Sequence, residues 1–381
     1  MKTFAEINEK IRKGKAVVVT AEEIIDITDE KGIKDAAQYV DVVTTATFGP
    51  MCSTGAFINF GHSDPPIRME KVFLNNVNAY AGLAAVDSYI GAAEVSGDLG
   101  IEYGGAHVIC DLIDGKKIRL QAYGKGTDCY PRKELDTYIT KESINEAYLF
   151  NPRNCYQNYS AAVNASDRAL YTYMGVLEPC MGNINYSTTG ELSPLLNDPY
   201  LRTIGIGTKI FLGGAPGYIS WQGTQFVSEK PRGENGVPLS SSATLALIGD
   251  LKLMSTEFIQ PAVFERYGTS IYVGVGIPIP VLDEELLESL SVRNKDIYTN
   301  IVDYSVPRRD KPVLAKCSYE ELRSGMVNLK GKKIKTAPLS SLYKSRLIAD
   351  KLKKWIQDGK FTLQEPIWAF PKVESLKLLN V

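Results

Sequence analysis

Helix and strand patterns alternate along the first 48 residues, and this alternation limits the fold class more than any other feature. FAEINEKI places apolar residues at helical spacing, and the apolar run at 16–20 predicts a strand. Thr20 and Glu23 have the spacing of a capping box that begins a helix ending at Gly32. The β-branched segment 40–48 predicts another strand. The sequence therefore predicts the α/β class, with mixed sheets, flanking helices and long functional loops.

The length of the chain fits two domains or one large domain. It has 381 residues, and a domain typically has about 100–200. After Pro280 the sequence becomes richer in lysine, and 340–360 has the pattern of an amphipathic helix ending at Gly359. We therefore predict a main α/β domain over 1–280 and a C-terminal helical and strand segment over 281–381 packed on it. A single domain is the alternative.

Segments rich in glycine, proline or asparagine interrupt the regular patterns. Residues 49–69 lack apolar periodicity and predict a loop of about twenty residues, a length that is usually functional inside a compact domain. Residues 106–123 predict a β-hairpin with Asp114 and Gly115 at its turn, leading directly into the irregular segment 124–132. Further irregular or strand-like segments lie at 151–164, 203–223, 270–281 and 297–304.

The charge balance excludes several classes of partner. The chain has 43 Lys and Arg residues against 44 Asp and Glu residues, a net charge of -1 at pH 7. Nucleic acids and anionic membranes attract broad basic surfaces, so we expect neither as a partner. No stretch approaches the roughly 18 consecutive apolar residues of a membrane span, and the charged N-terminus lacks the apolar core of a secretory signal. We therefore expect a cytoplasmic protein.

The glycine motifs and the two histidines give little support for a nucleotide or metal site. Segment 124–127 lacks the spacing of a P-loop, and His62 and His107 lack the spacing of a metal-binding motif. We expect no metal. His107 lies in a predicted apolar strand and is interpreted as a core residue. His62 lies beside Asp64 in the irregular segment and is a candidate acid or base.

The six cysteines differ in their surroundings. No CxxC pair occurs, so a zinc knuckle or a thioredoxin-type motif is not supported, and reduced buried thiols are the default. Cys52 and Cys129 instead lie in glycine-rich polar segments, and three basic residues lie within four positions of Cys129. Nearby cations favour the reactive thiolate, although Asp128 opposes them. The others are three that we interpret as structural, Cys110, Cys180 and Cys317, and one that stays open, Cys155.

Two long segments resemble a known family. They are TTATFGPMCSTGAFINFGHSDPPIRM, which contains Cys52, and GGAHVICDLIDGKKIRLQAYGKGTDCYPR, which contains Cys129. They are similar to the homocysteine-biosynthesis sulfur-incorporation family, the L-aspartate semialdehyde sulfurtransferases, and the resemblance extends over roughly 10–360. It implies an enzyme that incorporates sulfide into L-aspartate semialdehyde to form homocysteine. It also implies that Cys129 carries a persulfide, that Cys52 is a second required thiol, and that a separate ferredoxin-type iron–sulfur protein donates electrons.

The implied substrate suggests roles for polar side chains in the irregular segments. Its carboxylate favours an arginine fork, for which Arg68, Arg132 and Arg153 are candidates. Asp64 could hold the ammonium group, and His62 could protonate the carbonyl oxygen as sulfur adds. These roles follow from chemistry and position in the sequence, and the resemblance does not supply them.

Two other functions stay open. A non-catalytic sulfur carrier or scaffold would relay sulfur to a partner that performs the chemistry. An iron–sulfur protein would hold one cluster through Cys52, Cys129 and Cys155, whereas the main hypothesis expects no tightly bound cofactor. The expected partners are aspartate semialdehyde, sulfide and the electron donor, and assembly into a homo-oligomer stays open.

Overall fold

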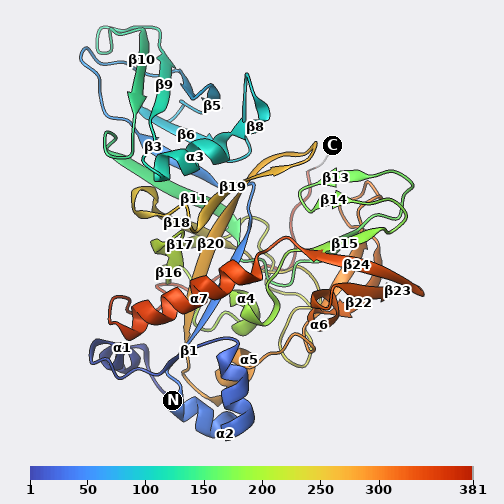
Figure 1. The fold of residues 1–381 in the computed structure, drawn as a ribbon. Helices are drawn as coiled ribbons and strands as arrows, with labels where there is room; N and C mark the ends of the chain where they lie inside the picture. The colour runs from blue at the N-terminus through green and yellow to red at the C-terminus, as the bar shows by residue number, and fades with distance from the viewer. Residues whose placement is uncertain (380–381) are drawn as a thin grey trace.

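A computed structural model describes residues 1–379, and three large β-sheets with flanking helices make up the fold of this part of the chain (Figure 1). This arrangement confirms the predicted α/β class. The largest sheet pairs its first two strands in parallel and the others antiparallel. Its strands, in spatial order, are β1 (Val18–Thr20), β2 (Val42–Pro50), β20 (Gly268–Pro280), β16 (Lys209–Leu212), β17 (Ala215–Gln222), β18 (Leu245–Asp250), β11 (Glu146–Asn154), β3 (Gly55–Asn59) and β6 (Asp87–Gly91), with β19 (Ile259–Phe264) paired to β20.

A smaller antiparallel sheet stands at one end of the molecule, at the top of Figure 1. The apolar helix α3 (Gly105–Ile113) packs between this sheet and β19. The loop that follows β9 carries Cys129. The strands of this sheet, in spatial order, are β10 (Glu134–Ile139), β9 (Ile118–Tyr123), β4 (Lys71–Leu74), β5 (Val77–Ala79), β7 (Val95–Ser96) and β8 (Gly100–Gly104).

The third sheet is mixed and combines strands from both sides of Pro280. The strand β12 pairs with β21 in parallel, and β15 pairs with β24 in parallel. The division of the chain at Pro280 stays a prediction. In spatial order the strands are β22 (Val313–Ser318), β21 (Tyr298–Asp303), β12 (Ala161–Val163), β15 (Asn183–Tyr186), β24 (Lys332–Pro338) and β23 (Met326–Leu329), and a separate hairpin is formed by β13 (Leu170–Thr172) and β14 (Gly175–Leu177).

The long C-terminal helix confirms the amphipathic pattern at 340–360. Helix α7 (Leu342–Gln357) begins after Ser341, whose side chain accepts a hydrogen bond from the Lys344 N–H at 3.3 Å. Its apolar face, with Ile348 and Leu352, is buried on β2 and β20. The other helices are α1 (Phe4–Arg12), α2 (Glu23–Tyr39), α4 (Pro194–Asn197), α5 (Glu284–Leu290) and α6 (Tyr319–Arg323), with single 3₁₀ turns at Gly190–Leu192 and Leu251–Leu253. Among residues 1–379, none of the helices combines the length and apolar character needed to cross a membrane.

The predicted capping box is confirmed. The Thr20 N–H donates to Glu23 Oε2 at 2.7 Å, and the Glu23 N–H donates to Thr20 Oγ1 at 3.2 Å. The predicted end of this helix at Gly32 is confirmed, because Gly32 has a non-helical backbone with φ of 74°, and a second helical segment follows it to Tyr39.

Two further predictions are corrected. The expected hairpin over 106–123 is instead helix α3 followed by β9, so His107 and Cys110 lie on a helix. Nearly every side chain of α3 is buried, and a short apolar run of this kind does not distinguish a buried helix from a strand. The expected loop over 49–69 contains β3, which is paired on both edges, with β11 and β6. Hydrogen bonding to both neighbours stabilises β3 as a strand although its local sequence favours a strand only weakly.

Candidate functional site

Cys52 lies in the short turn between β2 and β3. The turn is held by Thr54, whose backbone N–H and hydroxyl donate to the Met51 carbonyl at 3.0 and 2.7 Å. The Met51 N–H in turn donates to the Ile271 carbonyl at 2.8 Å, which ties the turn to β20. Cys52 is half-buried. The largest sheet therefore fixes the position of this thiol at the end of β2.

The Cys52 turn opens into a cavity of about 110 Å³ between the largest sheet and the third sheet. This volume is below the roughly 300–1,000 Å³ of pockets for drug-sized ligands, so the cavity has room only for a smaller molecule. Among the described residues that line the cavity, Arg153 is the charged one, and serine hydroxyls and tyrosines supply the other polar groups. The lining residues are Pro50, Met51, Cys52, Ser53, Arg153, Tyr156, Tyr159, Tyr173, Met174, Ser187, Phe264, Ser270, Leu339 and Ser340.

Arg153 reaches the cavity from β11 and is anchored there. Its Nε donates to Thr224 Oγ1 at 3.0 Å, and its backbone N–H donates to Asn151 Oδ1 at 3.0 Å. The Asn151 side chain also donates to Thr54 Oγ1 at 2.9 Å, which links β11 to the Cys52 turn. The bond from Nε fixes the plane of the guanidinium, and a carboxylate can bind the terminal nitrogens of such a fork.

Tyrosine side chains surround Cys52 and connect to one another. Tyr159 and Tyr173 share a hydrogen bond of 3.1 Å between hydroxyls, and Tyr173 and Tyr304 share another of 3.1 Å. Burial raises the pKa of Tyr267 to about 12, and the nearby Cys52 thiol and Tyr173 add to the rise. Burial also raises the pKa of Tyr159 and Tyr304. These phenols stay protonated near neutral pH and can donate hydrogen bonds into the cavity.

Cys129 lies elsewhere, on an exposed turn in the loop between β9 and β10. Backbone hydrogen bonds between Thr127 and Tyr130, of 2.8 and 3.1 Å, close the turn. The loop packs on segment 62–68, where the Arg132 guanidinium donates to the carbonyls of Asp64 and Pro65 at 2.7 and 2.9 Å.

The predicted site residues therefore form two groups. Arg153 lies with Cys52 in the cavity, whereas the other candidates lie in or beside the Cys129 loop. The His62 ring stacks on Tyr130 with centroids 6.2 Å apart, and the Arg68 carbonyl lies against Gly124. The predicted roles of His62, Asp64, Arg68 and Arg132 stay predictions, and Arg132 already uses two of its nitrogens to bind backbone carbonyls.

Strand β3 separates the two cysteines. Cys52 precedes its first residue, Gly55, and the segment that packs on the Cys129 loop follows its last residue, Asn59. With a rise of roughly 3.3 Å per residue, β3 alone spans about 13 Å. Cysteines joined in a disulfide have Cα atoms less than about 7 Å apart. The Cys129 loop belongs to the sheet at the top of Figure 1. The Cys52 cavity is instead lined in part by the hairpin of β13 and β14, at the right of Figure 1. Cys129 is not among the described residues that line the Cys52 cavity, so the two thiols belong to different parts of the fold.

Three of the other four cysteines, Cys110, Cys155 and Cys317, are buried. Cys155 follows β11 and lines a smaller cavity next to the Cys52 cavity, and burial raises its pKa. Burial also raises the pKa values of Cys110 and Cys317 to about 12, so these thiols stay protonated. Cys180 is exposed. Within residues 1–379, no group of three or more His, Cys, Asp or Glu side chains is placed to hold a metal ion.

His107, predicted as a core residue in a strand, is half-buried and lies on helix α3. Its Nδ1 accepts a hydrogen bond from the Gly104 N–H at 3.1 Å, and its ring stacks on Tyr103. Burial lowers its pKa, which keeps the ring neutral.

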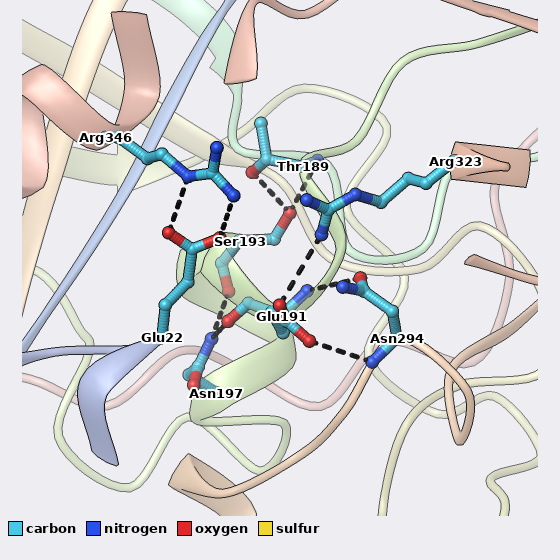
Figure 2. Close-up of polar contacts among 8 residues, drawn as sticks. All are labelled: Glu22, Thr189, Glu191, Ser193, Asn197, Asn294, Arg323 and Arg346. Carbon is cyan, nitrogen blue, oxygen red and sulfur yellow. Dashed lines mark hydrogen bonds and ion pairs between the residues drawn. The ribbon is translucent and has the colours of Figure 1, made fainter. Parts of the chain in front are cut away.

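A second polar cluster joins helices α2, α6 and α7 to segment 189–197 (Figure 2). Arg346 binds Glu22 through two hydrogen bonds of 2.7 Å. Arg323 pairs with Glu191 at 3.5 Å, and Glu191 also accepts a hydrogen bond from the Asn294 N–H at 3.1 Å. Because each of these charges is compensated within the cluster, its geometry favours a structural role in holding the sheets together.

Comparison with known proteins identifies the family. The family model described as homocysteine biosynthesis enzyme, sulfur-incorporation, matches residues 16–363. The L-aspartate semialdehyde sulfurtransferase of Methanosarcina acetivorans is 52% identical over 379 residues, which cover 100% of this chain and 74% of that protein. The protein of the same name from Methanocaldococcus jannaschii is 53% identical over 390 residues, covering 98% and 74%.

A more distant relative, an uncharacterized protein of Methanothermobacter thermautotrophicus, is 31% identical over 336 residues, which cover 85% of this chain and 72% of that protein. No solved structure matches the chain. The family model covers most of the chain, and two relatives of more than half identity cover nearly all of it. The chain belongs to the family of homocysteine biosynthesis enzymes that incorporate sulfur.

Proposed function

We propose that this chain is an L-aspartate semialdehyde sulfurtransferase, which forms homocysteine. The observation that carries the proposal is that Cys52 and Arg153 line one small cavity. A thiol and a guanidinium are the groups that sulfur chemistry on a carboxylate-bearing aldehyde requires. The printed names of the two relatives that are more than half identical support the same activity.

In the proposed complex the substrate carboxylate binds the Arg153 guanidinium and the aldehyde lies toward Cys52. The bond from Arg153 to Thr224 holds the guanidinium in place for a planar carboxylate. Tyr159 lies in the same cavity, its raised pKa keeps its hydroxyl protonated, and it can supply a proton to the carbonyl oxygen as sulfur adds.

The proposed reaction requires an outside source of electrons. Addition of hydrosulfide to the aldehyde carbon forms the carbon–sulfur bond. Loss of the oxygen as water, with uptake of two electrons and two protons, then gives the thiol. Sulfur that arrives as the outer atom of a persulfide requires two further electrons and two protons, which cleave the sulfur–sulfur bond. We propose that Cys129 receives this persulfide sulfur from a sulfane-sulfur donor such as polysulfide, a transfer that needs no oxidant, and that a ferredoxin-type iron–sulfur protein supplies the electrons.

The exposure of Cys129 also favours a second candidate, a sulfur carrier that delivers a persulfide to another enzyme. Both functions require reduced thiols, so we propose a cytoplasmic location. The two candidates differ in whether the chain itself consumes the aldehyde.

The test is an anaerobic assay with aspartate semialdehyde, polysulfide as the sulfur donor and a reductant, either reduced ferredoxin or titanium(III) citrate. Homocysteine is measured by mass spectrometry. Cys52→Ser and Cys129→Ser should each abolish its formation, whereas Cys180→Ser, at an exposed cysteine outside both groups, should retain it. A protein that acquires a persulfide on Cys129 but forms no homocysteine with either reductant would be a carrier.

A further inference from the structure

We propose that the Cys52 cavity of one copy of this chain is completed by the Cys129 turn of a second copy, so that sulfur passes between subunits. This inference rests on the proposed function, because it assumes that both thiols take part in one reaction. It explains how the two thiols can meet although β3 lies between Cys52 and the segment on which the Cys129 loop packs.

Several hydrogen bonds hold the Cys129 loop in place, so the loop cannot move to the Cys52 cavity of its own chain. The Arg132 guanidinium binds the carbonyls of Asp64 and Pro65, and the Gly124 N–H donates to the Lys133 carbonyl at 2.8 Å. The base of the loop continues directly into β9 and β10, which pair along their full length. Movement toward Cys52 would have to break these contacts, whereas a second copy can present the same turn without deforming it.

The surroundings of the cavity have the composition of a protein interface. We define the aromatic rim as Tyr171, Tyr173 and Tyr267. Tyr173 is 41% exposed and Tyr267 is 42% exposed, and their rings lie 6.1 Å apart. The Arg266 guanidinium lies over the Tyr171 ring at 4.8 Å. Tyrosine and arginine are enriched at the cores of protein interfaces.

The Cys129 turn complements this rim in charge and shape. Cys129 and its neighbour Asp128 are both exposed on a closed four-residue turn. Asp128 provides a carboxylate for Arg266 on the rim or Arg153 in the cavity, and Tyr130 provides an aromatic ring. A net charge of -1 gives two copies little mutual repulsion. In a two-fold symmetric dimer each turn would enter the cavity of the other chain, so one contact is used twice.

The sulfur transfer between the chains is balanced. The Cys52 thiolate attacks the outer sulfur of the Cys129 persulfide, which carries the proton. A bond forms between Cys52 Sγ and that sulfur, and the bond from the sulfur to Cys129 Sγ breaks. Cys129 leaves as a thiolate, and the proton stays on the transferred sulfur. The exchange consumes no electrons, and the reductant acts afterwards, on the persulfide of Cys52.

Mixed dimers test the proposal. Chains with Cys52→Ser and chains with Cys129→Ser are co-expressed with different affinity tags, and the dimer bearing both tags is isolated. Transfer between subunits predicts about half of the wild-type homocysteine formation, because one cavity has both thiols. The mirror dimer pairs a wild-type chain with a Cys52→Ser, Cys129→Ser chain and should be inactive. Transfer within a chain predicts the opposite pattern, which would overturn the proposal.

Two further measurements separate the remaining explanations. Separately purified Cys52→Ser and Cys129→Ser proteins, assayed immediately after mixing, should be inactive. Immediate activity would mean that sulfur diffuses freely between proteins. A monomer in analytical ultracentrifugation would exclude a second copy. Either result would overturn the proposal. Activity of Cys129→Ser alone would instead contradict the proposed function itself.

Discussion

Cys52 and Arg153 line the same cavity although Cys52 follows β2 and Arg153 lies on β11. The hydrogen bond from Asn151 to Thr54 joins the two segments at this point, so the thiol and the guanidinium are held by one network. The cavity thereby holds a thiol at a fixed position relative to a guanidinium, the groups to which we assign the sulfur chemistry and the substrate carboxylate. Proximity of this kind is a main source of catalytic rate.

Arg153→Ala should weaken substrate binding. Loss of a charge-assisted contact of about 1.5–3 kcal/mol corresponds to a rise of roughly 10- to 100-fold in the KM for aspartate semialdehyde. Steady-state kinetics check this prediction. The control variant is Arg68→Ala, whose residue lies beside the Cys129 loop. A larger rise in KM for Arg68→Ala than for Arg153→Ala would place the substrate beside Cys129.

Tyr267→Phe should slow alkylation of Cys52 by iodoacetamide at pH 8, because the phenol beside the thiol can stabilise its thiolate by donating a hydrogen bond. The experiment uses Cys129→Ser protein, and peptide mass spectrometry identifies the modified cysteine. Tyr218→Phe, at an exposed tyrosine on β17, is the matched control. Equal alkylation rates in both variants would remove Tyr267 from the environment of the thiol.

Arg132→Ala should loosen the Cys129 turn without affecting the Cys52 cavity. The variant loses the two hydrogen bonds to the carbonyls of Asp64 and Pro65. We expect amide hydrogen exchange at 127–130 to accelerate about tenfold, consistent with the loss of charge-assisted hydrogen bonds. Lys133→Ala is the control, and unchanged exchange in Arg132→Ala would show that the turn is held by its backbone alone.

Asp41→Asn should destabilise the fold at neutral pH. Burial opposes ionisation of Asp41, but hydrogen bonds from Lys10, Val17 and Lys2 outweigh it and lower the pKa of Asp41. A lowered pKa of a carboxyl contributes stability above its ordinary value, and this contribution disappears as the pH falls through the lowered pKa. The wild type should exceed the variant by about 2 kcal/mol in free energy of unfolding at pH 7.

The same comparison in acid provides the check on Asp41. Burial lowers the pKa of Lys2. This shift makes the stability depend on pH only in alkaline solution, so the pH dependence in acid comes from the carboxyl of Asp41. Urea titrations should show the difference between wild type and variant shrinking below about pH 4. A difference that stays constant down to pH 2 would exclude the charge of Asp41 as its source.

The sequence predicted local features well where one short segment determines them. The hydrogen bonds of the capping box join Thr20 and Glu23, three residues apart, and the amphipathic face of α7 repeats within a single helix. The apolar segment of α3 was misassigned because its burial depends on contacts with other sheets. Periodicity alone does not reveal such contacts.

The candidate site was predictable only in part for the same reason. Residue context separated Cys52 and Cys129 from the other cysteines, and Arg153 was one of three candidate arginines. The tyrosines around Cys52 were missed, because Tyr173, Tyr267 and Tyr304 come from segments distant in the sequence that meet only through pairing of the sheets. The separation of the two thiols by β3 likewise follows from topology, which local patterns do not contain.

A single-turnover experiment with isotopically labelled polysulfide, whose sulfane sulfur can form a persulfide without an added oxidant, tests the central claim most directly. Protein that carries the label as a persulfide is freed of excess polysulfide and then mixed with aspartate semialdehyde and reductant. The account predicts that the label moves from Cys129 into homocysteine in the wild type and stays on Cys129 in Cys52→Ser. Labelled homocysteine from Cys52→Ser at the wild-type rate would contradict the account.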